Sequence, residues 1–112
     1  EKETAFADAP NGIIGLETAV GVVLTKVVAE GVIDLSTMVE RMSCQPARAF
    51  GLPGGSLTKG SPGDVTVIDP SAMWTVDPEA FVSKSRNSPF VGWELTGRPC
   101  YTVVGGRVVF EV

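Results

Sequence analysis

The 112-residue sequence predicts an α/β protein in which helices come first and strands follow. In the first half, apolar residues recur at steps of three and four, which is the spacing of one helix face. In the second half, short runs rich in β-branched residues are bounded by residues that favour turns, a pattern typical of β-strands. A segment crowded with Gly, Pro and Ser, "GLPGGSLTKGSPGD" (51–64), separates the two regions. Neither region can bury its own apolar face, so we expect both to belong to a larger α/β protein.

The main helix is expected from Ile13 onward, after a polar loop. Val is only a middling helix former, so this helix depends on packing. Glu17 falls in its first turn, where a carboxylate interacts well with the helix dipole, and Gly31 supplies the stop. The apolar positions that share one face are Ile13, Leu16, Val20, Val23, Leu24, Val27 and Val28.

Two shorter helices are predicted after the main one. Ser36, or alternatively Asp34, can cap the first of them. Pro46 suits the first position of a short third helix, "PARAF", which Gly51 ends. Arg48 in that helix is expected to pair with a nearby carbonyl or acid.

The β region contains three predicted runs: "DVTVID" from Asp64, "MWTV" from Met73 and "PCYTVVGGRVVFEV" to the end. The last reads as a hairpin, with Gly105-Gly106 as its two-residue turn. Between the strands, "DPEAF" (77–81) places a capping Asp before a Pro, which favours a helical turn. The two tryptophans, Trp74 and Trp93, lie in strand-like runs and are expected to pack in the core.

Composition excludes several classes of function. The formal net charge is −4 and the nine basic residues are scattered, which argues against a nucleic-acid partner. The longest apolar run, 20–29, is interrupted and too short to span a membrane. Cys44 and Cys100 are far apart in sequence and are expected to be reduced thiols. With no histidine in the chain, they cannot complete a structural zinc site.

The stretch "APNGIIGLETA" (9–19) is the candidate binding element. Its Pro-Asn-Gly turn would present backbone N–H groups at the start of a helix, where anions bind well. The alternative is a plain turn that begins a helix. "KGSPGD" (59–64) superficially resembles a phosphate loop, but it lacks the Walker spacing and leads into a strand.

Four segments, in this order, resemble the carboxy-terminal portion of bacterial dihydroorotases of the amidohydrolase superfamily. The sharpest is "APNGIIGLETA", since dihydroorotases carry an Ala-Pro-x-Gly-Ile-x-Gly-x-Glu-Thr-Ala pattern there. The others are "MSCQPARAFGL" (42–52), "KGSPGDVTVIDP" (59–70) and "SKSRNSPFVGWELTGRPCYTVVGGRVVFE" (83–111). The resemblance covers essentially the whole chain. Because Glu1 is not a natural start, we expect the chain to begin within a longer protein.

The resemblance implies a (β/α)8 TIM barrel followed by a small β-sandwich. Residues 1–52 would form the end of the barrel, with its closing helices, and residues 53–112 the sandwich strands and terminal hairpin. It also implies the reversible hydrolysis of dihydroorotate to N-carbamoyl-L-aspartate in pyrimidine synthesis, with one or two zinc ions. The family's metal ligands and its catalytic aspartate lie outside this chain, so no catalytic or metal-binding residue is assigned within it.

What the resemblance assigns to this chain is substrate binding. The backbones of Asn11 and Gly12 would contact the substrate, and Ala9 and Pro10 would shape the loop. A glycine lets a ligand approach closely. Many relatives have an aromatic residue where this sequence has Asn11.

Alternatives remain open at this point. A related cyclic amidase, an allantoinase or hydantoinase, shares several of the motifs. A catalytically inactive homologue could instead serve as a structural subunit, for example of a transcarbamoylase. The isolated chain is expected to be inactive and the complete protein to be cytoplasmic. Its main partner is expected to be its own amino-terminal remainder, and a homo-oligomer or a transcarbamoylase complex is a further option.

Overall fold

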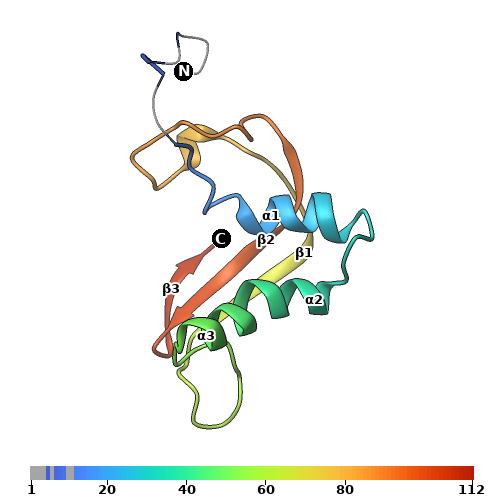
Figure 1. Cartoon of the computed structure of the whole chain (residues 1–112), viewed down its shortest axis with the longest axis vertical. Coiled ribbons are helices and arrows are strands. Elements are labelled where there is room, and N and C mark those ends of the chain that lie inside the picture. Colours follow the sequence, from blue (N-terminus) through green and yellow to red (C-terminus); the bar gives the residue numbers. More distant parts are fainter. Residues whose placement is uncertain (1–4, 6, 10–11) are drawn as a thin grey trace.

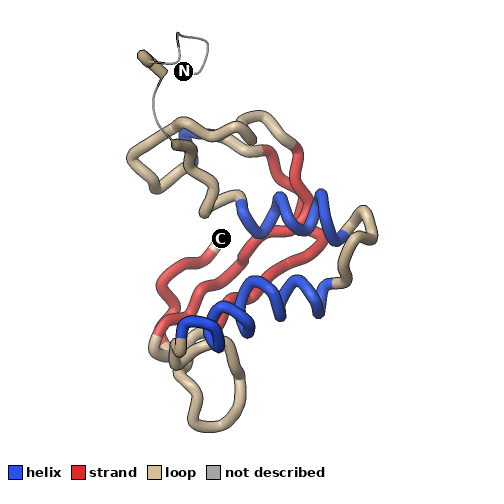
Figure 2. Tube along the Cα trace, in the orientation of Figure 1, coloured by secondary structure: helices blue, strands red, loops and turns tan. Residues whose placement is uncertain are grey.

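A computed structural model of the chain describes residues 5, 7–9 and 12–112. Over these residues, helices pack on a three-stranded antiparallel sheet, which confirms the α/β expectation at this level. The molecule is elongated, with extents of 53 × 28 × 27 Å. Figure 2 shows long loops at both ends of the helical and strand layers.

The main helix consists of α1 (Ala19–Val23) and a continuation in wider π-type turns, η1 (Leu24–Val28). In this continuation the Ala29 N–H donates to the Leu24 carbonyl five residues earlier, at 2.9 Å. Gly31 follows with a φ of 73°, a left-handed conformation that suits glycine and ends the helix as predicted.

The predicted start of this helix at Ile13 is wrong, because the helix begins at Ala19. Residues 13–18 form other hydrogen bonds. The Ile14 N–H donates to the Asn87 carbonyl at 3.0 Å, and the Thr18 N–H and hydroxyl both donate to the Gly15 carbonyl. Of the apolar residues predicted for the helix face, Ile13 and Leu16 precede the helix and are largely exposed.

A second helix runs without a break through α2 (Leu35–Val39), η2 (Glu40–Cys44) and α3 (Gln45–Phe50). Asp34 caps it, and the Asp34 Oδ1 accepts a hydrogen bond from the Thr37 N–H at 2.7 Å. Of the two candidate caps, Asp34 rather than Ser36 therefore fills the position. This hydrogen bond lowers the pKa of Asp34.

The prediction that "PARAF" forms a separate helix is wrong. Pro46 lies inside the continuous second helix, directly after the wide turns of η2. Turns of the i→i+5 type change which backbone donors are needed, so a proline without an N–H is tolerated there. The end of the helix is as predicted: Gly51 is left-handed, with a φ of 64°. Arg48 pairs with Glu40, eight residues earlier on the same helix, as expected for an anchoring role.

The sheet has the order β1-β2-β3, with β1 (Val65–Thr75), β2 (Glu94–Val104) and β3 (Arg107–Glu111). The hairpin between β2 and β3 turns at Gly105-Gly106, which confirms that prediction. The two runs predicted as separate strands join into β1, which is bent by a register shift between Asp69 and Met73. The predicted helical turn is present as η3 (Pro78–Ala80), capped by Asp77.

The core forms where α1 lies against β2 (Figure 1). Its buried residues are Val76, Phe81 and Leu95. Two glycines permit the close approach. A Cβ on Gly21 would lie 3.0 Å from both the Leu95 and the Trp74 side chains, and a Cβ on Gly97 would lie 2.3 Å from Leu24. The main helix and β2 therefore pack closely at these two glycines, where a larger side chain would hold them apart.

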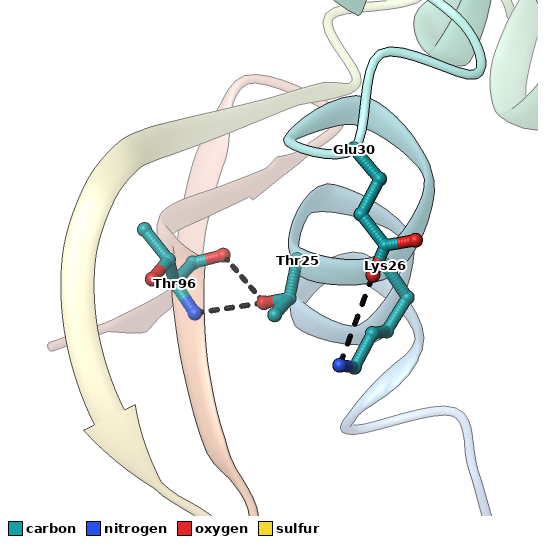
Figure 3. A network of polar contacts seen from close by, with 4 residues as sticks. All are labelled: Thr25, Lys26, Glu30 and Thr96. Carbon is teal, nitrogen blue, oxygen red and sulfur yellow. Dashed lines mark hydrogen bonds and ion pairs between the residues drawn. The ribbon is translucent and has the colours of Figure 1, made fainter.

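A polar contact fixes the register of helix on strand. The Thr25 hydroxyl accepts a hydrogen bond from the Thr96 N–H at 2.8 Å and donates to the Thr96 carbonyl at 3.3 Å (Figure 3). Trp74 adds a third link from β1, since its indole N–H donates to the Gly97 carbonyl at 3.0 Å. Trp74 thus packs against the core as predicted, whereas Trp93 is 41% exposed and meets the edge of Phe90.

Much apolar surface faces outward in this chain. The side chains of β3 are exposed along its whole length, and Phe50, Leu57 and Val82 are also largely exposed. Among the described residues, no helix is both long enough and apolar enough to cross a membrane.

Candidate functional site

The candidate binding loop is described at Ala9 and Gly12, whereas Pro10 and Asn11 lie outside the described residues. The Ala9 N–H donates to the Ala5 carbonyl at 3.1 Å. Gly12 is exposed and has a φ of 71°. Among the described residues other than its immediate chain neighbours, no heavy atom lies within 4 Å of the position that a Cβ would take there. The backbone at Gly12 is thus open to the approach of another molecule.

The carboxyl side of Gly12 is held by a loop that is distant in sequence. We refer to residues 82–88, between η3 and β2, as the 82–88 loop. The Asn87 side-chain amide donates to the Gly12 carbonyl at 2.6 Å. The Asn87 carbonyl in turn accepts from the Ile14 N–H at 3.0 Å. Asn87 therefore binds the backbone on both sides of Ile13.

Glu17 makes a second attachment between the same two segments. Its carboxylate accepts hydrogen bonds from the Val82 N–H at 3.0 Å and the Ser83 N–H at 3.1 Å. Hydrogen bonding from Ser83 and then from Val82 holds the pKa of Glu17 below its usual value, with a smaller contribution from the charge of Arg86. The predicted place of Glu17 in the first turn of the main helix is wrong, because Glu17 precedes Ala19, where the helix begins, and its carboxylate binds the 82–88 loop.

These attachments border a shallow hollow with an empty volume of about 170 Å³, which includes space open to solvent. Residues 14–18 form one wall, and Phe81, Ser83 and Ser88 form the other. In Figure 1, the 82–88 loop and the segment leading into α1 lie at the end of the fold away from the turn between β2 and β3. Sequence reasoning missed Asn87, which stands in the segment "SKSRNSPF" but carries no local signal of a contact 75 residues away.

The described residues supply no grouping of three or more Cys, Asp or Glu side chains that could hold a metal ion. Cys44 and Cys100 are both partly buried free thiols, in line with the prediction. Among the described residues, the site consists of an exposed backbone at Gly12, followed by a segment that the side chains of Asn87 and Glu17 attach to the 82–88 loop.

The chain is similar to known proteins along nearly all of its length. The model of the amidohydrolase family matches residues 7–109. A dihydroorotase from Geobacter metallireducens is 50% identical over 111 residues, and one from Geobacter sp. strain M21 is 51% identical over 111 residues. In both cases the match covers 99% of this chain and 26% of the relative. The chain therefore spans about a quarter of the length of these curated relatives.

The solved structures that the chain resembles include hydantoinases. An L-hydantoinase (dihydropyrimidinase) from Arthrobacter aurescens has 40% identity and a TM-score of 0.85, covering 92% of this chain and 23% of that one. A D-hydantoinase (dihydropyrimidinase) from Thermus sp. has 32% identity and a TM-score of 0.86, covering 96% and 24%. With the family model matched along nearly all of its length, this chain belongs to the amidohydrolase family.

Proposed function

We propose that this chain is the carboxy-terminal part of a dihydroorotase, which interconverts dihydroorotate and N-carbamoyl-L-aspartate in pyrimidine synthesis. The observation that carries the proposal is the 50% identity to a dihydroorotase across 99% of the chain. The identity to the hydantoinase structures is lower, at 40% and 32%. A hydrolase of cyclic amides is supported by both sets of relatives, and the dihydroorotase reaction by the more similar set.

The proposal includes the architecture of the complete protein. Residues 1–52 would close a (β/α)8 barrel, and residues 53–112 would contribute strands and the hairpin to a β-sandwich. The exposed strand β3 supports this, because Val108, Val109 and Phe110 present apolar side chains at the edge of the sheet. An exposed apolar edge strand calls for a partner layer, which the amino-terminal remainder of the same protein would supply.

In the proposed enzyme, this chain provides one wall of the substrate site. Main-chain groups at Asn11 and Gly12 would hold the carboxylate of dihydroorotate, and Ala9 and Pro10 would shape the loop. The positive φ and open surroundings of Gly12 support a close approach of ligand to backbone. A charged acceptor bound by backbone N–H groups forms a charge-assisted hydrogen bond, about twice as strong as a neutral one.

One or two zinc ions belong to the proposed enzyme, with ligands outside this chain. The described residues, which bring no three suitable side chains together, do not fit a zinc site. The catalytic aspartate is likewise assigned outside the chain. We therefore propose that the isolated chain is inactive. The proposal places the complete enzyme in the cytoplasm, as a homo-oligomer or in complex with a transcarbamoylase.

The proposal predicts the substrate preference of the complete protein. With zinc present, the full-length protein is expected to hydrolyse dihydroorotate with a kcat/KM at least about 100-fold above that for hydantoin or allantoin. Ultraviolet absorbance and product chromatography measure the three rates. A preference for hydantoin or allantoin would assign the protein to the related cyclic amidases. No turnover of any of the three would favour the inactive structural homologue.

A further inference from the structure

We infer that Asn87 is a positioning residue for the substrate loop of the proposed enzyme. This inference rests on the proposed function, and it goes beyond it by assigning a role to the 82–88 loop. It starts from two hydrogen bonds of one residue. The Asn87 side chain holds the Gly12 carbonyl at 2.6 Å, and its carbonyl holds the Ile14 N–H at 3.0 Å.

These two hydrogen bonds restrict the backbone conformation next to the proposed binding groups. Glycine has the widest conformational freedom of any residue type, and at Gly12 no described residue beyond the chain neighbours comes within 4 Å of the Cβ position. Without an external contact, the peptide group that joins Gly12 to Ile13 could rotate. The bond from Asn87 fixes the carbonyl of that group, and the bond to Ile14 fixes the following turn of the chain.

The 82–88 loop is itself held by hydrogen bonds, so it can support the substrate loop. The Asn87 N–H donates to the Ser85 hydroxyl at 3.2 Å, and the Arg86 guanidinium binds the Ser83 carbonyl. At its other end, the loop is held by Glu17 through the N–H groups of Val82 and Ser83. A support that is attached at both ends can hold the substrate loop in one geometry.

The contacts of Asn87 are expected to affect the geometry of the substrate loop more than the stability of the fold. The hydrogen bonds made by the side chains of Asn87, Glu17 and Arg86 are exposed, so each contributes little to the free energy of unfolding. The effect of Asn87 on a loop that binds substrate is expected to appear in substrate affinity instead. A change in loop geometry weakens binding even where the fold is retained.

The test uses the full-length protein with Asn87→Asp and Asn87→Ala. The Asp variant has nearly the same shape, but it replaces the donor with an acceptor facing the Gly12 carbonyl, and the Ala variant removes the side chain. Both are expected to raise KM for dihydroorotate about fivefold, with the larger effect for Asp and kcat within about twofold of wild type. Thermal melting confirms that each variant is folded.

Asp64→Ala is the matched control. The Asp64 carboxylate accepts from the Gly105 N–H at 2.7 Å, so it is also an exposed side chain holding a distant backbone group, but at the hairpin end of the molecule. This variant is expected to leave KM unchanged. An unchanged KM in both Asn87 variants, or an equal rise in the control, would overturn the inference.

Hydrogen exchange of the Ile14 amide distinguishes failure of the inference from failure of the proposed function. Faster exchange in Asn87→Ala than in wild type is expected whatever the substrate. If wild type turns over no dihydroorotate, the proposed function fails and the role of Asn87 toward substrate fails with it. If wild type is active but exchange and KM are unaltered in the variants, only the assignment of Asn87 fails.

Discussion

Replacing Gly97 with alanine is expected to lower the free energy of unfolding by about 3 kcal/mol. Two effects combine at this position. Gly97 has a φ of 92°, which a residue with a Cβ adopts only at a cost of roughly 1–2 kcal/mol. The added Cβ would also lie 2.3 Å from Leu24 Cδ1 and 3.2 Å from Leu24 Cβ, so the main helix and β2 would have to separate. Overpacking of this kind costs about 1–3 kcal/mol.

Gly60→Ala separates the two effects. Gly60 has a φ of 95°, almost the same as that of Gly97, but no atom beyond its chain neighbours lies within 4 Å of the Cβ position. This control variant is expected to lower the free energy of unfolding by only about 1–2 kcal/mol, because it carries the cost of the backbone conformation without the steric clash. Urea unfolding of the full-length protein and both variants measures the difference. Equal losses would show that the main helix does not contact β2 closely at Gly97.

Leu95→Ala is expected to cost about 3 kcal/mol of unfolding free energy. Leu95 is 1% exposed, in the core with Val76 and Phe81, and it also contacts the α1 backbone at Gly21. Truncation removes apolar contacts and leaves a cavity where the helix, the sheet and the loop after η3 meet. Phe81 also lines the hollow that residues 14–18 border, so the cavity is expected to loosen that wall of the hollow as well.

Leu95→Met is the matched control for the cavity. It conserves volume and apolar character, and is expected to cost less than about 1.5 kcal/mol. Chemical denaturation of the full-length protein with either residue measures both values. If Leu95→Met lowers the free energy of unfolding as much as Leu95→Ala, the shape of the Leu95 side chain matters more than its volume. The cavity explanation would then be wrong.

Local features of the fold were predictable where one residue determines the backbone. Gly51 and the Gly105-Gly106 turn adopt the left-handed conformations that glycine permits, and Asp77 caps the turn that follows it. Each of these depends on residues within a few positions, so the sequence shows it directly. The joining of two predicted strands into β1 depends instead on pairing with β2, a strand distant in sequence, and no local pattern shows it.

The contacts of the candidate site were the least predictable part. Glu17 fits the first turn of a helix by sequence, but it binds the backbone of Val82 and Ser83, 65 and 66 residues away. The segment before α1 is also held by a long-range hydrogen bond, from the Ile14 N–H to the Asn87 carbonyl, and α1 begins only at Ala19. Pro46 favours the start of a helix because proline usually stands there, and the wide turns of η2 that accommodate it have no sequence signature.

Gly12→Ala in the full-length protein tests whether the loop at Gly12 is a wall of a dihydroorotate site, as we propose. Gly31→Ala is its control, since Gly31 has a φ of 73° against 71° for Gly12 and equally open surroundings. Both variants therefore carry the same backbone strain. We expect KM for dihydroorotate to rise at least about tenfold in Gly12→Ala and to stay at the wild-type value in Gly31→Ala. The same KM in both variants would contradict the claim.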